Sequence, residues 1–97
     1  MIRSFAGRGT EDIFNGVNSV DARRLLPRKL WETAFRRLDL IDSATRLDDL
    51  RSPPGNRLES LKGDRSGQYS IRINDQYRIC FEWDGIDARS VEIVDYH

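Results

Sequence analysis

The sequence predicts an α+β fold in which helices pack on one face of an antiparallel β-sheet. Residues 69–97 contain three runs of alternating apolar and polar side chains, which is the pattern of half-buried strands. Residues 27–42 instead repeat apolar side chains at helical spacing behind a proline, which suits the first turn of a helix. Because the helical pattern precedes all three strand patterns, we expect a meander of neighbouring strands covered by helices.

The register of the three strands follows from keeping apolar side chains on one face of the sheet. A loop of three residues, 74–76, places Ile71 opposite Ile79, whereas a two-residue loop would bring Arg78 to the core side. A second three-residue loop, 85–87, continues the same face into the last strand. The predicted core face consists of Tyr69, Ile71, Ile73, Ile79, Phe81, Val91 and Ile93.

The opposite face of this sheet is expected to be open and polar. In the predicted register Arg72 lies directly opposite Arg78, and two facing positive charges destabilise a sheet unless something neutralises them. Glu92, a diagonal neighbour of Arg78, could supply the opposite charge. An anionic ligand such as a phosphate could also do so. Tyr96 is the other diagonal neighbour of Arg78 on this face.

The amino-terminal half is expected to supply an edge strand and two helices. Residues 1–6 alternate weakly, and Thr10 is predicted to cap a short helix that ends at Gly16. The longer helix covers residues 27–42 and carries basic side chains on its outer face. That basic row is interpreted either as solvated surface or as a contact to a nucleic-acid backbone or an acidic partner. One more helical turn is expected within residues 43–50.

Length and charge bound the possible functions. The 97 residues are expected to form one domain, residues 1–97, and 16 acidic and 16 basic side chains give no net charge. A protein that holds nucleic acid by bulk charge is usually basic, so a nucleic-acid role here would need a local patch or another docking molecule. The single cysteine, Cys80, excludes an internal disulfide and a cysteine-cluster metal site. No membrane span or signal peptide is recognised, so a cytoplasmic protein is expected.

Four motifs occur together and span nearly the whole chain. They are Met1-Ile2-Arg3-Ser4-Phe5, the run Leu61-Lys62-Gly63-Asp64-Arg65 followed by Gly67-Gln68-Tyr69-Ser70-Ile71, the pair Tyr77-Arg78, and the ending Val94-Asp95-Tyr96-His97. In this order they resemble the HigB-like toxins of bacterial toxin–antitoxin modules, a branch of the RelE superfamily. The resemblance implies a RelE-like fold and a toxin that cuts messenger RNA in the ribosomal A site without a metal or cofactor. It also implies three partners: a cognate helix-turn-helix antitoxin of the HigA type, the ribosome, and operator DNA bound only through the antitoxin.

The reaction implied by this resemblance is attack of a ribose 2′-hydroxyl on the adjacent phosphate. It needs a base, cations that stabilise the phosphorane, and an acid for the leaving oxygen. By resemblance, Arg78 would stabilise the transition state, Lys62 would hold phosphate and contribute to proton transfer, and Tyr96 would position the nucleotide. His97 would act as acid or base, with Asp95 beside it. Arg65 and Arg72 are added as candidates for phosphate binding.

One position departs from the family pattern. Two residues before the leucine of the Leu-Lys-Gly-Asp-Arg run the family often has histidine, and this chain has Glu59. A glutamate acts as a base when its pKa is raised, whereas the nearby positive charges of Arg57 and Lys62 would lower it. Glu59 is therefore a candidate base, and the identity of the base stays open. In the predicted register His97 also falls on the opposite parity from Arg78.

Two other functions are compatible with the sequence. A protein of the same fold could occupy the A site and inhibit translation without cutting RNA. Alternatively, the sheet could bind DNA as a β-ribbon, with Arg72 and Arg78 entering a groove. The neutral net charge counts against the DNA-binding interpretation.

Overall fold

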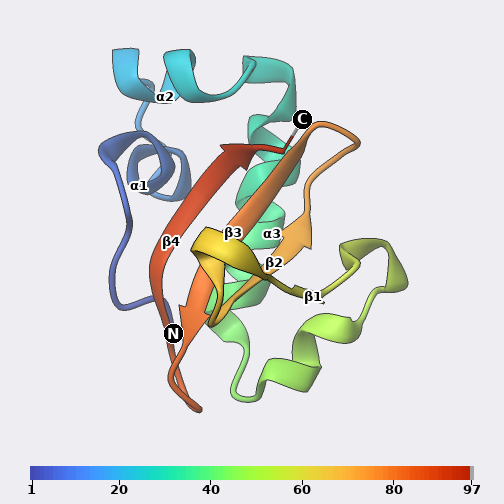
Figure 1. Cartoon of the computed structure of the whole chain (residues 1–97). Helices are drawn as coiled ribbons and strands as arrows, with labels where there is room; N and C mark the ends of the chain where they lie inside the picture. The colour runs from blue at the N-terminus through green and yellow to red at the C-terminus, as the bar shows by residue number, and fades with distance from the viewer. Residues whose placement is uncertain (97) are drawn as a thin grey trace.

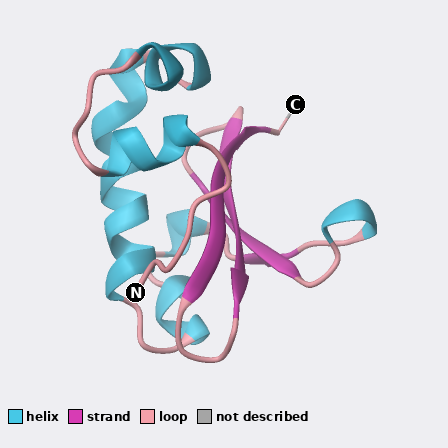
Figure 2. Ribbon diagram, turned by 90° about the vertical axis from the view of Figure 1, so that its left-hand side faces the viewer, coloured by secondary structure: helices cyan, strands magenta, loops and turns pink. Residues whose placement is uncertain are grey.

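The computed structural model describes residues 1–96, in which the α-helices form one layer and a β-sheet forms the other (Figure 1, Figure 2). This arrangement confirms the predicted α+β fold. No helix in this part of the chain is long and apolar enough to cross a membrane. The elements, where η marks a short 3-10 helix, are α1 (Arg8–Phe14), α2 (Val20–Leu25), η1 (Arg28–Leu30), α3 (Trp31–Ser43), η2 (Leu47–Arg51), η3 (Pro54–Asn56), β1 (Glu59–Ser60), η4 (Gly63–Arg65), β2 (Gln68–Arg72), β3 (Tyr77–Trp83) and β4 (Ala88–Asp95).

The sheet has the order β1-β2-β3-β4, and each neighbouring pair is antiparallel. The predicted register of the first hairpin is confirmed, since Ile71 lies opposite Ile79 and Arg72 lies opposite Arg78. The turn needs no glycine, because the side-chain oxygen of Asn74 accepts hydrogen bonds from the backbone N–H groups of Gln76 and Tyr77. β1 adds a fourth strand at the edge, beside β2.

The second hairpin corrects the predicted three-residue loop. Trp83 pairs with Ala88, so four residues, 84–87, form the loop. A bulge in β4 then restores the predicted pairing with β3 beyond this point. In the bulge, Ser90 and Val91 both lie opposite Phe81. Ser90 takes a left-handed conformation with a φ of 53° there. The bulge keeps Val91 on the core side, so the predicted core face survives the change in loop length.

The hydrophobic core lies between the sheet and helix α3. The predicted core-face residues all belong to it, with Tyr69 half-buried at its margin and the others buried. From the helical layer, Ala34, Leu38 and Ile41 of α3 are fully buried in the same cluster. These positions recur every three or four residues, which is the apolar stripe predicted for this helix. The polar residues that alternate with the core face therefore point away from the helices.

The amino-terminal segment runs parallel to β4 without becoming a regular strand. Two isolated bridges join Ile2 to Ala88 and Phe5 to Val91. Between these bridges the bulge interrupts the ladder, and the Ser4 hydroxyl accepts the hydrogen bond of the Ser90 N–H instead. The predicted edge position is thus correct, but a continuous edge strand is not formed.

Helix α1 begins earlier than predicted. Gly7 precedes it with a φ of 106°, a conformation that favours glycine, and Thr10 lies inside the helix rather than at its cap. The Thr10 side chain is buried, and its Oγ1 accepts a hydrogen bond from the backbone N–H of Ile93 at 3.0 Å. A hydroxyl that could cap a helix instead provides a partner for an edge-strand amide of β4, so the capping prediction is wrong.

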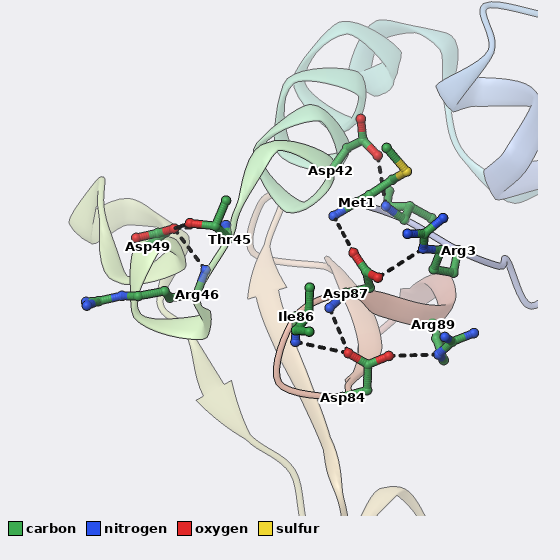
Figure 3. A network of polar contacts seen from close by, with 11 residues as sticks. Met1, Arg3, Asp42, Thr45, Arg46, Asp49, Asp84, Ile86, Asp87 and Arg89 are labelled. Atoms are coloured by element: carbon green, nitrogen blue, oxygen red, sulfur yellow. Dashed lines mark hydrogen bonds and ion pairs between the residues drawn. The ribbon is translucent and has the colours of Figure 1, made fainter.

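A network of carboxylates fixes the loops at one end of the sheet (Figure 3). Asp84 accepts hydrogen bonds from the backbone N–H groups of Asp87 and Ile86 and from Arg89, and these bonds lower its pKa to about 2. Asp87 binds Arg3, which lowers the Asp87 pKa and ties the amino-terminal segment to the hairpin. This end of the sheet is therefore held by charge-assisted hydrogen bonds.

Candidate functional site

Arg78 is the centre of the polar face of the sheet, and it is only 7% exposed. Its Nε donates a hydrogen bond to the Ser70 hydroxyl at 2.8 Å, and its Nη2 donates to the carbonyl oxygen of Arg57 at 2.6 Å. The carboxylate of Glu59 lies 3.8 Å from Nη2. The ring of Tyr96 lies 5.7 Å from the guanidinium carbon, within cation–π range. A fixed guanidinium is thus joined to a carboxylate and an aromatic ring.

The centre of this face is buried, which corrects the expectation of an open face. Ser70 and Cys80 are fully buried there, together with Arg78. The cause is the segment from residue 57 to residue 67, which supplies β1 along the edge and then η4 across the sheet (Figure 1). Burial raises the pKa of the Cys80 thiol.

The facing arginines are neutralised by separate carboxylates. Arg72 pairs with Asp75 in the turn that follows it, and Arg78 has Glu59 from β1. Glu92, which the sequence suggested as the partner of Arg78, binds Arg65 instead. That suggestion is therefore wrong, because the residue that reaches Glu92 comes from η4, whose position across the sheet could not be read from strand alternation.

Arg65 is held on this face by two side chains. Its Nη2 lies 2.9 Å from Oε1 of Glu92, and its Nη1 donates to Oε1 of Gln68 at 3.0 Å. The hydrogen bond to Glu92 raises the pKa of Arg65 above its usual value. Both charged side chains remain about one-third exposed. The charge of Arg65 is therefore already paired, whereas a residue dedicated to phosphate binding would be expected to keep its charge available.

The remaining candidate residues lie at the edges of this site. Asp95 ends β4, is exposed, and accepts a hydrogen bond from the Gln76 side chain at 3.0 Å. Tyr96 is 48% exposed and is held by its backbone N–H, which donates to the Gln76 carbonyl at 2.7 Å. Lys62 is exposed at the start of η4, and no hydrogen bond or ion pair within residues 1–96 joins it to Arg78. His97 lies outside the described residues.

Two groups that hold Arg78 were not singled out from the sequence. Ser70 shares the polar face and is a diagonal neighbour of Arg78 in the confirmed register, so strand alternation contained a signal for it. The carbonyl of Arg57 had no such signal. Arg57 follows η3 with a left-handed φ of 46°, a conformation that its residue type does not predict.

Chemically, this arrangement is suited to an anionic phosphate ester. A guanidinium that is held in place stabilises developing negative charge, a carboxylate beside it can accept a proton, and an exposed tyrosine ring can stack on a base. No group of three or more histidine, cysteine, aspartate or glutamate side chains within residues 1–96 is placed to hold a metal ion. A hollow of about 340 Å³ lies elsewhere, between α1, α2 and β4, and none of the candidate residues lines it.

Comparison with known proteins identifies the family to which this chain belongs. The family described as "RelE-like toxin of type II toxin-antitoxin system HigB" matches residues 4–97. Endoribonuclease HigB of Proteus vulgaris is 35% identical over 98 aligned residues, which cover all of both chains. Toxin HigB-1 of Vibrio cholerae serotype O1 is 48% identical over 64 residues, covering 65% of this chain and 67% of that protein.

A solved structure supports the fold. The YoeB-YefM complex from Staphylococcus aureus contains a chain that matches all of this one, over 98% of its own length, with a TM-score of 0.56. The two sequences are 19% identical, so this likeness concerns the fold alone.

Proposed function

This chain belongs to the HigB-like family of RelE-like toxins from type II toxin–antitoxin systems, and we propose that it is an endoribonuclease that cuts messenger RNA in the ribosomal A site. Endoribonuclease activity is supported by the full-length relative of that name from Proteus vulgaris. The observation that carries the proposal is the fixed guanidinium of Arg78, with the ring of Tyr96 on one side and the carboxylate of Glu59 on the other. Residues 1–97 would act as one domain.

In the proposed mechanism the ribose 2′-hydroxyl attacks the adjacent phosphate and the 5′-oxygen leaves. Arg78 stabilises the added negative charge of the phosphorane, which is the role expected of a preorganised guanidinium. Glu59 accepts the hydroxyl proton, since it is the carboxylate nearest to Arg78 among the ion pairs of the described residues. Tyr96 stacks on a base of the message, because its ring is exposed and lies beside the guanidinium of Arg78.

Other residues have supporting roles in this proposal. Lys62 contacts a neighbouring phosphate from the exposed start of η4. His97, which follows Tyr96, protonates the leaving oxygen or acts as the base. Asp95 positions the end of β4 through its bond to Gln76. Arg72, about one-third exposed and paired with a fully exposed Asp75, is free to exchange that partner for phosphate, whereas Arg65 is held by Glu92.

The neutral charge of the chain supports a role for the ribosome as docking partner. With 16 acidic and 16 basic residues, the protein has little long-range attraction for free RNA. We propose that translating ribosomes in the cytoplasm supply the substrate. We also propose a HigA-like helix-turn-helix antitoxin as the neutralising partner, with operator DNA bound through that antitoxin.

The test is a translation reaction in which new 5′ ends of the message are mapped. Wild-type protein should cut the translated message and leave the same RNA largely intact without ribosomes. Arg78→Ala should lower the cleavage rate by roughly 10²- to 10³-fold, as the loss of one transition-state donor does elsewhere. Arg24→Ala, which removes an exposed arginine of α2, is the matched control and should cut normally.

Two results would replace this proposal. Arrest of translation without new 5′ ends, unchanged in Arg78→Ala, would indicate an inhibitor that occupies the A site without cutting. Tight binding of operator DNA by this chain alone would instead favour the β-ribbon function. Efficient cutting of free RNA would leave the nuclease assignment in place and remove the ribosome from it.

A further inference from the structure

We propose that Ser70 is a positioning residue for Arg78, holding the guanidinium so that its Nη1 side faces the phosphate. This inference rests on the proposed function of the site. The Ser70 side chain and carbonyl bind one edge of the guanidinium, at 2.8 Å to Nε and 3.3 Å to Nη2. Both residues are buried, so solvent does not compete strongly for these bonds.

The contacts leave one side of the guanidinium for the substrate. Nε and Nη2 share the edge that arginine uses for bidentate binding, and here that edge is occupied by Ser70 and by the Arg57 carbonyl. Nη1 makes no hydrogen bond within residues 1–96. A phosphate oxygen would therefore approach the guanidinium on its Nη1 side.

Ser70 can orient two members of the site from one position of the sheet. It lies in β2 between Glu59 of β1 and Cys80 of β3, as the Cα partner of both. Its hydroxyl and carbonyl bind Arg78, while its pairing with Glu59 fixes the position of the Glu59 backbone at the sheet edge. A side chain that is fully buried has few alternative rotamers, so the hydroxyl is held in the place where Nε needs it.

The second anchor of Arg78 is a backbone group. The Arg57 carbonyl accepts from Nη2 at 2.6 Å, and it is presented by a left-handed residue directly after Asn56. The Asn56 side chain fixes this loop by donating to the carbonyls of Leu50 and Ser52. No side-chain substitution removes the Arg57 carbonyl, so Ser70 is the anchor that can be tested directly.

The experiment is a double-mutant cycle on ribosome-dependent cleavage. Ser70→Ala should lower kcat by about 10-fold or more with little change in KM, because small misplacements of a transition-state donor are costly while the substrate binds mainly elsewhere. In an Arg78→Lys background the same change should alter kcat by less than about 2-fold, since lysine has no Nε to hold. Ser4→Ala, which removes a different serine–backbone bond, is the matched control and should leave kcat unchanged in both backgrounds.

A second measurement needs neither activity nor a stable Ser70→Ala variant. In ¹H–¹⁵N NMR spectra of the wild type, the Nε–H of Arg78, identified by its loss in Arg78→Lys, should exchange with solvent far more slowly than that of the exposed Arg24. Ser70→Thr keeps the hydroxyl and should preserve this protection.

Three outcomes would overturn the proposal: a normal kcat in a folded Ser70→Ala, an equal loss in both backgrounds, or fast exchange at the Arg78 Nε–H. These are distinct from failure of the proposed function. If Arg78→Ala itself cuts at the wild-type rate, Arg78 is not the transition-state donor and the mechanism proposed above fails. If Arg78→Ala is inactive and Ser70→Ala is fully active, only the positioning role is lost.

Discussion

Glu59 and Arg78 come from β1 and β3, two strands that are separated by β2, and their side chains meet on the polar face with 3.8 Å between Oε1 and Nη2. Glu59 is about half exposed, while Arg78 is almost buried. The carboxylate therefore sits at the mouth of the site, with the guanidinium behind it. A substrate phosphate that approached Arg78 would displace Glu59 from this ion pair and leave its carboxylate beside the reacting atoms.

This geometry predicts a large contribution of Glu59 to the cleavage rate. Glu59→Gln should lower kcat by about 10²-fold, the usual contribution of general-base catalysis, since an amide does not accept the hydroxyl proton. Glu59→His should retain more activity than Glu59→Gln, since a neutral imidazole can accept a proton. Single-turnover cleavage on ribosomes provides the measurement. An unchanged rate in Glu59→Gln would transfer the role of base to another group.

Arg65 is predicted to contribute to stability more than to RNA binding. Removing it by Arg65→Ala leaves Glu92 without its partner, and a pair that is about one-third exposed should be worth at most about 1 kcal/mol in the free energy of unfolding. Denaturant titration of Arg65→Ala, Glu92→Gln and the double variant should show coupling between the two sites. Cleavage rates should fall less than in Arg78→Ala. A loss as large as that of Arg78→Ala, with unchanged stability, would assign Arg65 to phosphate binding instead.

The carboxylates of the second hairpin predict acid sensitivity of the fold. The pKa of Asp84 is about 2 in the folded protein and 3.8 in the reference state, so the folded state binds its proton less tightly. The stabilisation from Asp84 is therefore complete above pH 3.8 and is lost as the pH falls toward 2. Asp84→Asn should lower the melting temperature at pH 6 and weaken its dependence on pH in the range 2–4. Asp39→Asn, on the exposed side of α3, serves as the control and should follow the wild-type curve.

The buried bond between Thr10 and Ile93 predicts a specific loss of stability. Thr10→Val keeps the shape of the side chain but leaves the Ile93 N–H without an acceptor, which should cost about 1–3 kcal/mol in the free energy of unfolding. Thr10→Ser keeps the hydroxyl and should cost less than Thr10→Val. Equilibrium unfolding in urea compares the variants. Equal stability of Thr10→Val and wild type would mean that the Ile93 amide finds another partner.

The sequence was sufficient for those features of the sheet that depend on period-two alternation. A shift of one residue would have moved Ile79 to solvent and Arg78 to the core side, so burial of apolar side chains alone fixed this hairpin and placed Arg72 opposite Arg78. The same rule gave the correct core face in β4, although the loop before it was predicted one residue too short. The bulge at Ser90 absorbed the extra residue, because the free energy of burying Val91 and Phe81 exceeds the cost of one irregular residue.

The sequence was not sufficient for residues whose role depends on a distant partner. Thr10 is of a residue type that commonly caps helices, but the Ile93 amide that it binds lies 83 residues away in the chain. Whether a hydroxyl caps its own helix or serves a strand depends on which donor the fold brings within reach.

By itself, the sequence determined the core face of the sheet and the set of polar residues that share the other face, since both follow from local alternation and the need to bury apolar surface. Only the tertiary structure decided how the charges on that face are paired. The segment between residues 57 and 67 brings Glu59 and the Arg57 carbonyl to Arg78, and Arg65 to Glu92. Ion pairs are set by short-range distances between side chains. They could therefore be assigned only once the path of that segment across the sheet was known.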